Sequence, residues 1–149
     1  MHIFLEGAAK WILVLHALSA VVLIGSLAHL AWRALRGTLA ARGLQNQWVL
    51  WSYIVTFVSG VLIYPTYRYY VRALYFERAE GLKPANFFFE VKEHLSALGL
   101  ILLLAYWLIS RIADEKEVVR FRRVSAVSLF VIVLYGYVAS LVLNNLKGI

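Results

Sequence analysis

The sequence predicts an all-α integral membrane protein built as a bundle of four transmembrane helices. Of its 149 residues, 62% are hydrophobic and only 15% are charged, and the mean hydropathy is +0.75. A soluble domain of this composition would expose too much apolar surface. A hydrocarbon core about 30 Å thick is crossed by about 20 helical residues, and four apolar runs of that length nearly exhaust the chain. We therefore expect a single transmembrane domain, residues 1–149.

The four predicted spans are marked by aromatic and charged residues at their ends. Tryptophan and tyrosine collect at the headgroup level of a bilayer. The first span begins and ends at tryptophan, the second ends in a Tyr-Pro-Thr-Tyr sequence whose proline is expected to kink the helix at the membrane edge, and the third and fourth follow charged segments. The predicted spans are 11–32, 48–67, 91–110 and 124–143.

The loop charges predict an orientation in a cell membrane. The first loop carries three arginines and no acid, and the third loop carries five basic residues against three acidic ones. Both loops lie on one side of a four-span chain, so the positive-inside rule makes that side cytoplasmic and puts the termini outside, as in a bacterial inner membrane. Loop Lys and Arg facing anionic headgroups explain the net charge of +7, and we expect no nucleic-acid partner.

Two histidines lie at similar depths in the predicted spans. Ionisable side chains are costly inside a bilayer and mark functional sites there. His16 lies about 7 Å into the first span and His94 about 5 Å into the third, at 1.5 Å per residue. The two spans run in the same direction, so both depths are measured from one membrane face. The pair predicts one haem b between these helices, with His16 and His94 as axial ligands of the iron.

Other interpretations of these histidines stay open. His16 could be a hydrogen-bonded helix contact and His94 an interfacial residue, or the two could bind a non-haem metal with Glu90 or Glu93. The chain has no cysteine, so thiolate ligands and covalent haem attachment are excluded. His29, thirteen positions after His16, is rotated from it by about 220° at 100° per residue and is expected at the interface.

Three basic residues are expected where haem propionates would leave the bundle. Arg68, Arg72 and Lys92 lie at the same predicted membrane edge as the two histidines. Arginine pairs well with carboxylates, so these residues are predicted to bind the propionates. Among the glycines of the spans, Gly60 and Gly136 are the better candidates for giving clearance to a flat ring.

A family resemblance adds to this interpretation. Leu15-His16-Ala17 early in the first span and Val91-Lys92 at the head of the Leu-rich third span resemble the small four-helix membrane haem proteins of the protoporphyrinogen-oxidase and copper-resistance D types. The resemblance implies roles for His16 and Lys92 in haem binding and activity. Glu90 stands where the oxidase family usually has a histidine. Copper handling is disfavoured, because cuprous sites prefer Cys and Met and the only methionine is Met1.

The function expected from these features is that of a b-type cytochrome in electron transfer or redox chemistry. The sequence contains no nucleophile beside a base and no phosphate-binding glycine loop, so no catalytic residue is assigned. The expected partners are the lipid bilayer, a quinone or other redox subunits, and a larger oligomer. The alternatives are a non-catalytic structural subunit of a membrane redox complex and a protoporphyrinogen-oxidase-like enzyme.

Overall fold

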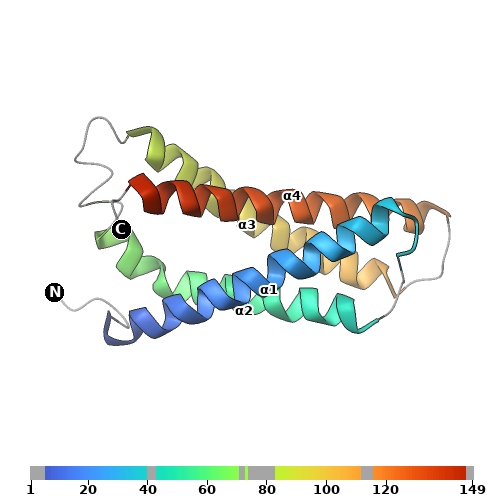
Figure 1. Cartoon of the computed structure of the whole chain (residues 1–149), viewed down its shortest axis with the longest axis horizontal. Helices are drawn as coiled ribbons and strands as arrows, with labels where there is room; N and C mark the ends of the chain where they lie inside the picture. The colour runs from blue at the N-terminus through green and yellow to red at the C-terminus, as the bar shows by residue number, and fades with distance from the viewer. Residues whose placement is uncertain (1–5, 40–42, 71–72, 74–82, 112–115, 147–149) are drawn as a thin grey trace.

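The computed structural model describes residues 6–39, 43–70, 73, 83–111 and 116–146 (Figure 1). A short 3-10 helix, η1 (Glu6–Ala8), leads into α1 (Ala9–Leu35), and the other helices are α2 (Leu44–Tyr67), α3 (Lys83–Ile109) and α4 (Lys116–Leu146). The all-α four-helix bundle predicted from the sequence is confirmed.

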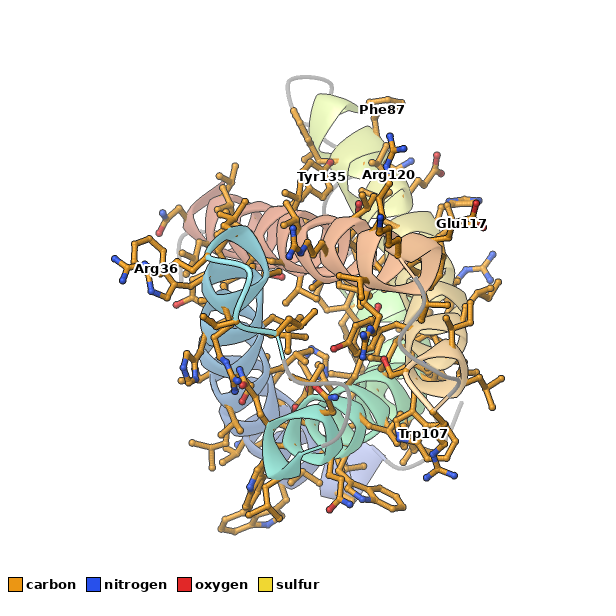
Figure 2. The ribbon with its side chains drawn as sticks, turned by 90° about the vertical axis from the view of Figure 1, so that its right-hand side faces the viewer. Arg36, Phe87, Trp107, Glu117, Arg120 and Tyr135 are labelled. Carbon is orange, nitrogen blue, oxygen red and sulfur yellow. The ribbon has the colours of Figure 1, made fainter. Side chains whose placement is uncertain are left out.

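The helices alternate in direction. Three predicted spans lie within one helix each, and the third, 91–110, extends one residue beyond the end of α3. We call the end where α1 and α3 begin the terminal end, and the end where α2 and α4 begin the opposite end (Figure 1). Packing is extensive between α1 and α2, α3 and α4, and α1 and α4, and it is sparse between α2 and α3. Viewed along the bundle, α1 and α3 are therefore diagonal to each other (Figure 2).

The outer surface of the bundle suits a bilayer. In the described part of the chain, three segments are long and apolar enough to cross a membrane: Ala9–Leu35, Leu44–Tyr70 and Lys116–Leu143. Large apolar side chains such as Val21 and Val131 lie more than half exposed on them, as expected of helices that are apolar all round. The chain is thus a multi-pass membrane protein. That α3 also crosses the membrane stays a prediction, since its first half carries Glu90, Lys92 and Glu93.

The core occupies the middle of the bundle and its opposite end, where Leu27, Val49, Leu103 and Leu129 are almost completely buried. The third predicted loop is shorter than expected, because α4 already begins at Lys116. Arg122, which we expected in that loop, is therefore inside α4 and only 3% exposed.

Polar contacts tie the helices together near Arg122. The Tyr106 hydroxyl donates to Asn46 Oδ1 at 3.2 Å, and Arg33 Nη1 donates to Gln45 Oε1 at 3.1 Å. These bonds join α3 to α2 and α1 to α2. The opposite end is thus closed by both apolar packing and hydrogen bonds.

The end of α2 differs from a simple kinked helix. Pro65 lies inside α2, and Arg68, Tyr69 and Tyr70 continue it as a π-helical turn. Proline removes one backbone donor, and a wider turn is a common local adjustment to a disturbed hydrogen-bond ladder. Tyr67 stacks on Phe89 of α3 with ring centroids 4.9 Å apart, which holds this segment against the start of α3.

Candidate functional site

His16 is held in the seam between α1 and α2. Its Nδ1 lies 2.8 Å from the Thr56 carbonyl oxygen and 3.2 Å from Ser59 Oγ. A carbonyl oxygen can only accept, so Nδ1 carries the proton and Nε2 is the lone-pair atom of the ring. The Ser59 hydroxyl already donates to the Val55 carbonyl at 2.6 Å, which leaves Ser59 Oγ as a second acceptor for His16.

The position of His16 follows from the register of α1. Leu23 and Leu30 follow it at intervals of seven residues and are buried, so the histidine continues the inward stripe of the helix. On α2, Gly60 lies beneath the ring: a Cβ added there would be 3.2 Å from His16 Cε1. The absence of a side chain at Gly60 therefore lets the imidazole pack closely on α2.

Small polar residues extend this seam. Thr56 Oγ1 donates to Ser19 Oγ at 2.9 Å, and Ser19 donates to the His16 carbonyl at 3.0 Å. Ser52 and Ser59 are buried on the same helix as Thr56. The small polar side chains of this part of α2 therefore face the interior of the bundle.

Lys92 brings a cation into the terminal end from α3. Its side chain is partly buried, and Nζ donates to Ser140 Oγ of α4 at 2.7 Å. Ser140 donates in turn to the Gly136 carbonyl at 2.7 Å. The interior region of the terminal end thus contains one imidazole, between α1 and α2, and one ammonium group, between α3 and α4.

His94 lies on a different face of α3. Its side chain is exposed, and Nδ1 is 2.8 Å from the Glu90 carbonyl oxygen of its own helix. His94 follows Lys92 by two residues, which is a rotation of about 200° around a helix. When Lys92 faces inward, His94 must therefore face outward. The structure does not bring His94 into the region that holds His16 and Lys92.

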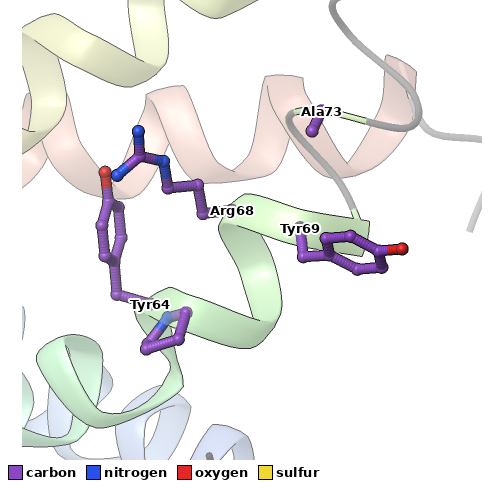
Figure 3. Close-up of a pocket in the computed structure, with 5 residues that line it drawn as sticks. Tyr64, Arg68, Tyr69 and Ala73 are labelled. Carbon is purple, nitrogen blue, oxygen red and sulfur yellow. The ribbon is translucent and has the colours of Figure 1, made fainter. Parts of the chain in front are cut away.

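Of the remaining predicted site residues, the structure describes Arg68, which does not point into this interior region. Arg68 is exposed and lines an open groove at the end of α2 with Tyr64, Pro65, Tyr69 and Ala73 (Figure 3). His29 is exposed on α1, and Arg72 lies outside the described residues.

The alternative metal site is not formed in the described part of the chain. No three His, Asp or Glu side chains there are grouped so that they could hold a metal ion. His16 and His94 with Glu90 or Glu93 therefore do not make such a set in this arrangement.

Sequence reasoning missed Ser140, the hydrogen-bond partner of Lys92. It lies four residues after Gly136 and so on the same side of α4, which is a signal that the sequence does carry.

Comparison with known proteins adds no identification: no family model, curated protein or solved structure matches this chain.

Proposed function

We propose that this membrane protein binds one haem b, without covalent bonds, in the interior of its terminal end, and takes part in electron transfer or related redox chemistry. The observation that carries the proposal is the hydrogen bond from His16 Nδ1 to the Thr56 carbonyl oxygen at 2.8 Å. Metal-ligating histidines almost always donate their other ring N–H to a carbonyl, carboxylate or water, which fixes the tautomer and orientation of the ring. His16 has this arrangement, with Nε2 as its ligand atom.

The residues present fit one internal imidazole ligand better than a pair. His94 would have to leave the exposed face of α3 before its ring could reach the interior. We therefore propose His16 as the axial ligand of the haem iron. Ligation by His94 is tested by the His94→Ala variant below. When bound, haem would supply one-electron redox chemistry.

Lys92 is the basic residue best suited to a propionate. A carboxylate inside an apolar bundle keeps its charge at lower cost beside a cation, and the Lys92 ammonium is already directed inward by Ser140. This role replaces the one expected for Arg68, whose side chain is exposed on the outer surface. The resemblance to the oxidase family implies the same two residues, His16 and Lys92, so an oxidase-like activity stays an alternative.

A second candidate function is a structural subunit of a membrane redox complex. It is favoured by the fact that His16 already has two hydrogen-bond acceptors on α2, which is enough to explain an imidazole at a helix contact. A quinone, other redox subunits and an oligomeric assembly are proposed partners of either function.

The visible spectrum of the purified protein separates the two functions. The chain would be expressed with an adequate haem supply and purified in detergent, and the reduced-minus-oxidised spectrum and the haem-to-protein ratio would be measured. We expect the α-band of a b-type haem in the wild type. His16→Ala should abolish stoichiometric haem, whereas His29→Ala, a matched change at an exposed position of the same helix, should retain it.

His94→Ala decides the ligand set. Retention of haem would support a single histidine ligand, and loss equal to that in His16→Ala would restore the predicted pair. Circular dichroism and gel filtration show whether each variant folds. A folded, colourless wild type after haem supplementation would contradict haem binding and favour the structural subunit.

A further inference from the structure

We propose that the groove at the end of α2 is a binding site for the phosphate headgroup of an anionic phospholipid. The groove is lined by Tyr64, Pro65, Arg68, Tyr69 and Ala73. These residues include neither His16 nor Lys92, so this inference does not rest on the proposed function.

The polar groups of the groove suit a phosphate. The Arg68 guanidinium reaches toward the Tyr64 hydroxyl, whereas the Tyr69 ring, which also lines the groove, points away from both (Figure 3). Arginine presents several N–H donors in a planar fork that matches phosphate geometry, and tyrosine can add a hydroxyl donor. No carboxylate is among the described residues that line the groove. A net negative headgroup is therefore favoured over one that also carries a choline cation.

The depth of the groove matches the headgroup region. Arg68 and Tyr69 lie near the end of the candidate membrane span Leu44–Tyr70. Basic residues at the end of a transmembrane helix meet the phosphate layer of the bilayer, where anionic lipids attract them. The groove therefore faces lipid headgroups rather than bulk solution alone.

An apolar stripe leads from the groove toward the middle of the span. Val58, Val61, Pro65 and Arg68 follow one another at intervals of three and four residues, so they share one face of α2. Val58 is 49% and Val61 56% exposed, and Pro65 and Arg68 are exposed as well. This face extends about 15 Å along the helix at 1.5 Å per residue. An acyl chain can lie along it while the headgroup contacts Arg68.

The groove is built on an ordered aromatic framework. Tyr64 and Tyr67 pack with Phe89 in a cluster that includes the buried residues Ala85 and Leu143. The Tyr64 and Phe89 rings are nearly parallel, at an interplanar angle of 2° and a centroid separation of 6.3 Å. The Tyr64 hydroxyl is therefore positioned before a lipid arrives, and little side-chain entropy is lost on binding.

Arginines at the other end of the bundle provide a matched control. Arg36 lies over the Trp32 ring at 4.4 Å, and Arg111 lies over the Trp107 ring at 3.6 Å. Both are exposed basic residues near the end of a helix, as Arg68 is. Arg36→Gln therefore removes the same charge from the protein surface as Arg68→Gln, without touching the groove.

The test measures lipid retention by native mass spectrometry of the detergent-solubilised protein. Phosphatidylglycerol and phosphatidylcholine with matched acyl chains are added at equal concentrations, and the ratio of bound lipids is recorded. An arginine near an anionic headgroup contributes about fivefold in affinity. We expect wild type to prefer phosphatidylglycerol, Arg68→Gln to lose most of that preference, and Arg36→Gln to keep it. Tyr64→Phe retains the ring packing and should cause a smaller loss.

Several outcomes would overturn the inference. An unchanged lipid ratio in Arg68→Gln, or an equal loss in Arg36→Gln, would show that the groove does not select the headgroup. Displacement of the lipid by millimolar inorganic phosphate would assign the groove to free phosphate. A fall in thermal stability of Arg68→Gln with unchanged lipid selectivity would indicate that the Arg68 charge stabilises the C-terminal end of α2 through the helix dipole. Loss of haem from Arg68→Gln with unchanged lipid selectivity would indicate that Arg68 binds the haem propionates, as the sequence predicts.

Discussion

Gly99→Ala tests the contact between α2 and α3, the most sparsely packed neighbours in the bundle. Tyr53 of α2 is only 3% exposed, and its hydroxyl donates to the Ser96 carbonyl of α3 at 2.8 Å. A Cβ at Gly99 would overlap the Tyr53 hydroxyl oxygen and would lie 3.2 Å from both Tyr53 Cζ and Ile132 Cγ2. The added methyl group therefore cannot fit unless Tyr53 leaves its hydrogen bond.

The structure sets the expected size of the effect. Leaving the buried phenolic hydroxyl without a partner costs about 1–3 kcal/mol, and overpacking costs about 1–3 kcal/mol. Alanine stabilises a helix over glycine by about 1 kcal/mol. We therefore expect Gly99→Ala to lower the free energy of unfolding by about 1–5 kcal/mol. Unfolding in mixed micelles, titrated with a denaturing detergent and followed by circular dichroism, measures this change.

Two further variants make the test specific. Gly25→Ala is the control, because no atom lies within 4 Å of a Cβ added at Gly25, and it should be neutral or stabilising. In the double variant Tyr53→Phe, Gly99→Ala the overlapping hydroxyl is absent, so the protein should regain part of the stability lost in Gly99→Ala. If Gly99→Ala unfolds like Gly25→Ala, or if the double variant shows no recovery, the proposed clash is wrong.

Two other predictions concern the interior site and the topology. Gly60→Ala should reduce haem retention, because the added Cβ would lie only 3.2 Å from His16 Cε1. Gly136→Ala should retain haem, because the nearest atom to its added Cβ is Lys92 Cγ at 3.9 Å. Equal haem contents in the two variants would contradict this prediction. The chain has no cysteine, so Thr38→Cys and Glu117→Cys can each be labelled alone in intact cells with a membrane-impermeant thiol reagent. Both should react from the same membrane face, and opposite accessibility would refute the up-and-down topology.

Composition was sufficient to predict the architecture. Runs of about 20 apolar residues cannot remain extended in lipid, because every backbone polar group there needs an internal partner. That requirement does not depend on which residues face inward, so the helices could be placed from hydropathy alone. The helix ends were less predictable: α4 begins eight residues before the predicted span at 124–143, because a helix can continue beyond its apolar run.

The candidate site was predicted only in part, since depth along a helix and direction around it are separate quantities. His16 and Lys92 are partly buried, but His94, at nearly the depth of Lys92, is exposed. Averaged hydropathy contains no information on direction. Arg68 shows the same limit: its position at the membrane edge was predicted, but the direction of its side chain was not.

The direction of each side chain can nevertheless be read from the sequence, because the inward positions of a helix recur at alternating intervals of three and four residues. Positions 85, 89, 92, 96, 99, 103 and 106 of α3 follow that repeat, and all of them are buried or partly buried. Positions 122, 126, 129, 133, 136, 140 and 143 of α4 do the same. Such a repeat keeps one face of a helix toward its neighbours along the whole length of a bundle. Lys92, Ser140 and Arg122 lie on these stripes and His94 does not. A polar residue on an inward stripe needs a hydrogen-bond partner inside the protein. The stripes, rather than depth alone, therefore indicate that Lys92, and not His94, shares the interior of the terminal end with His16.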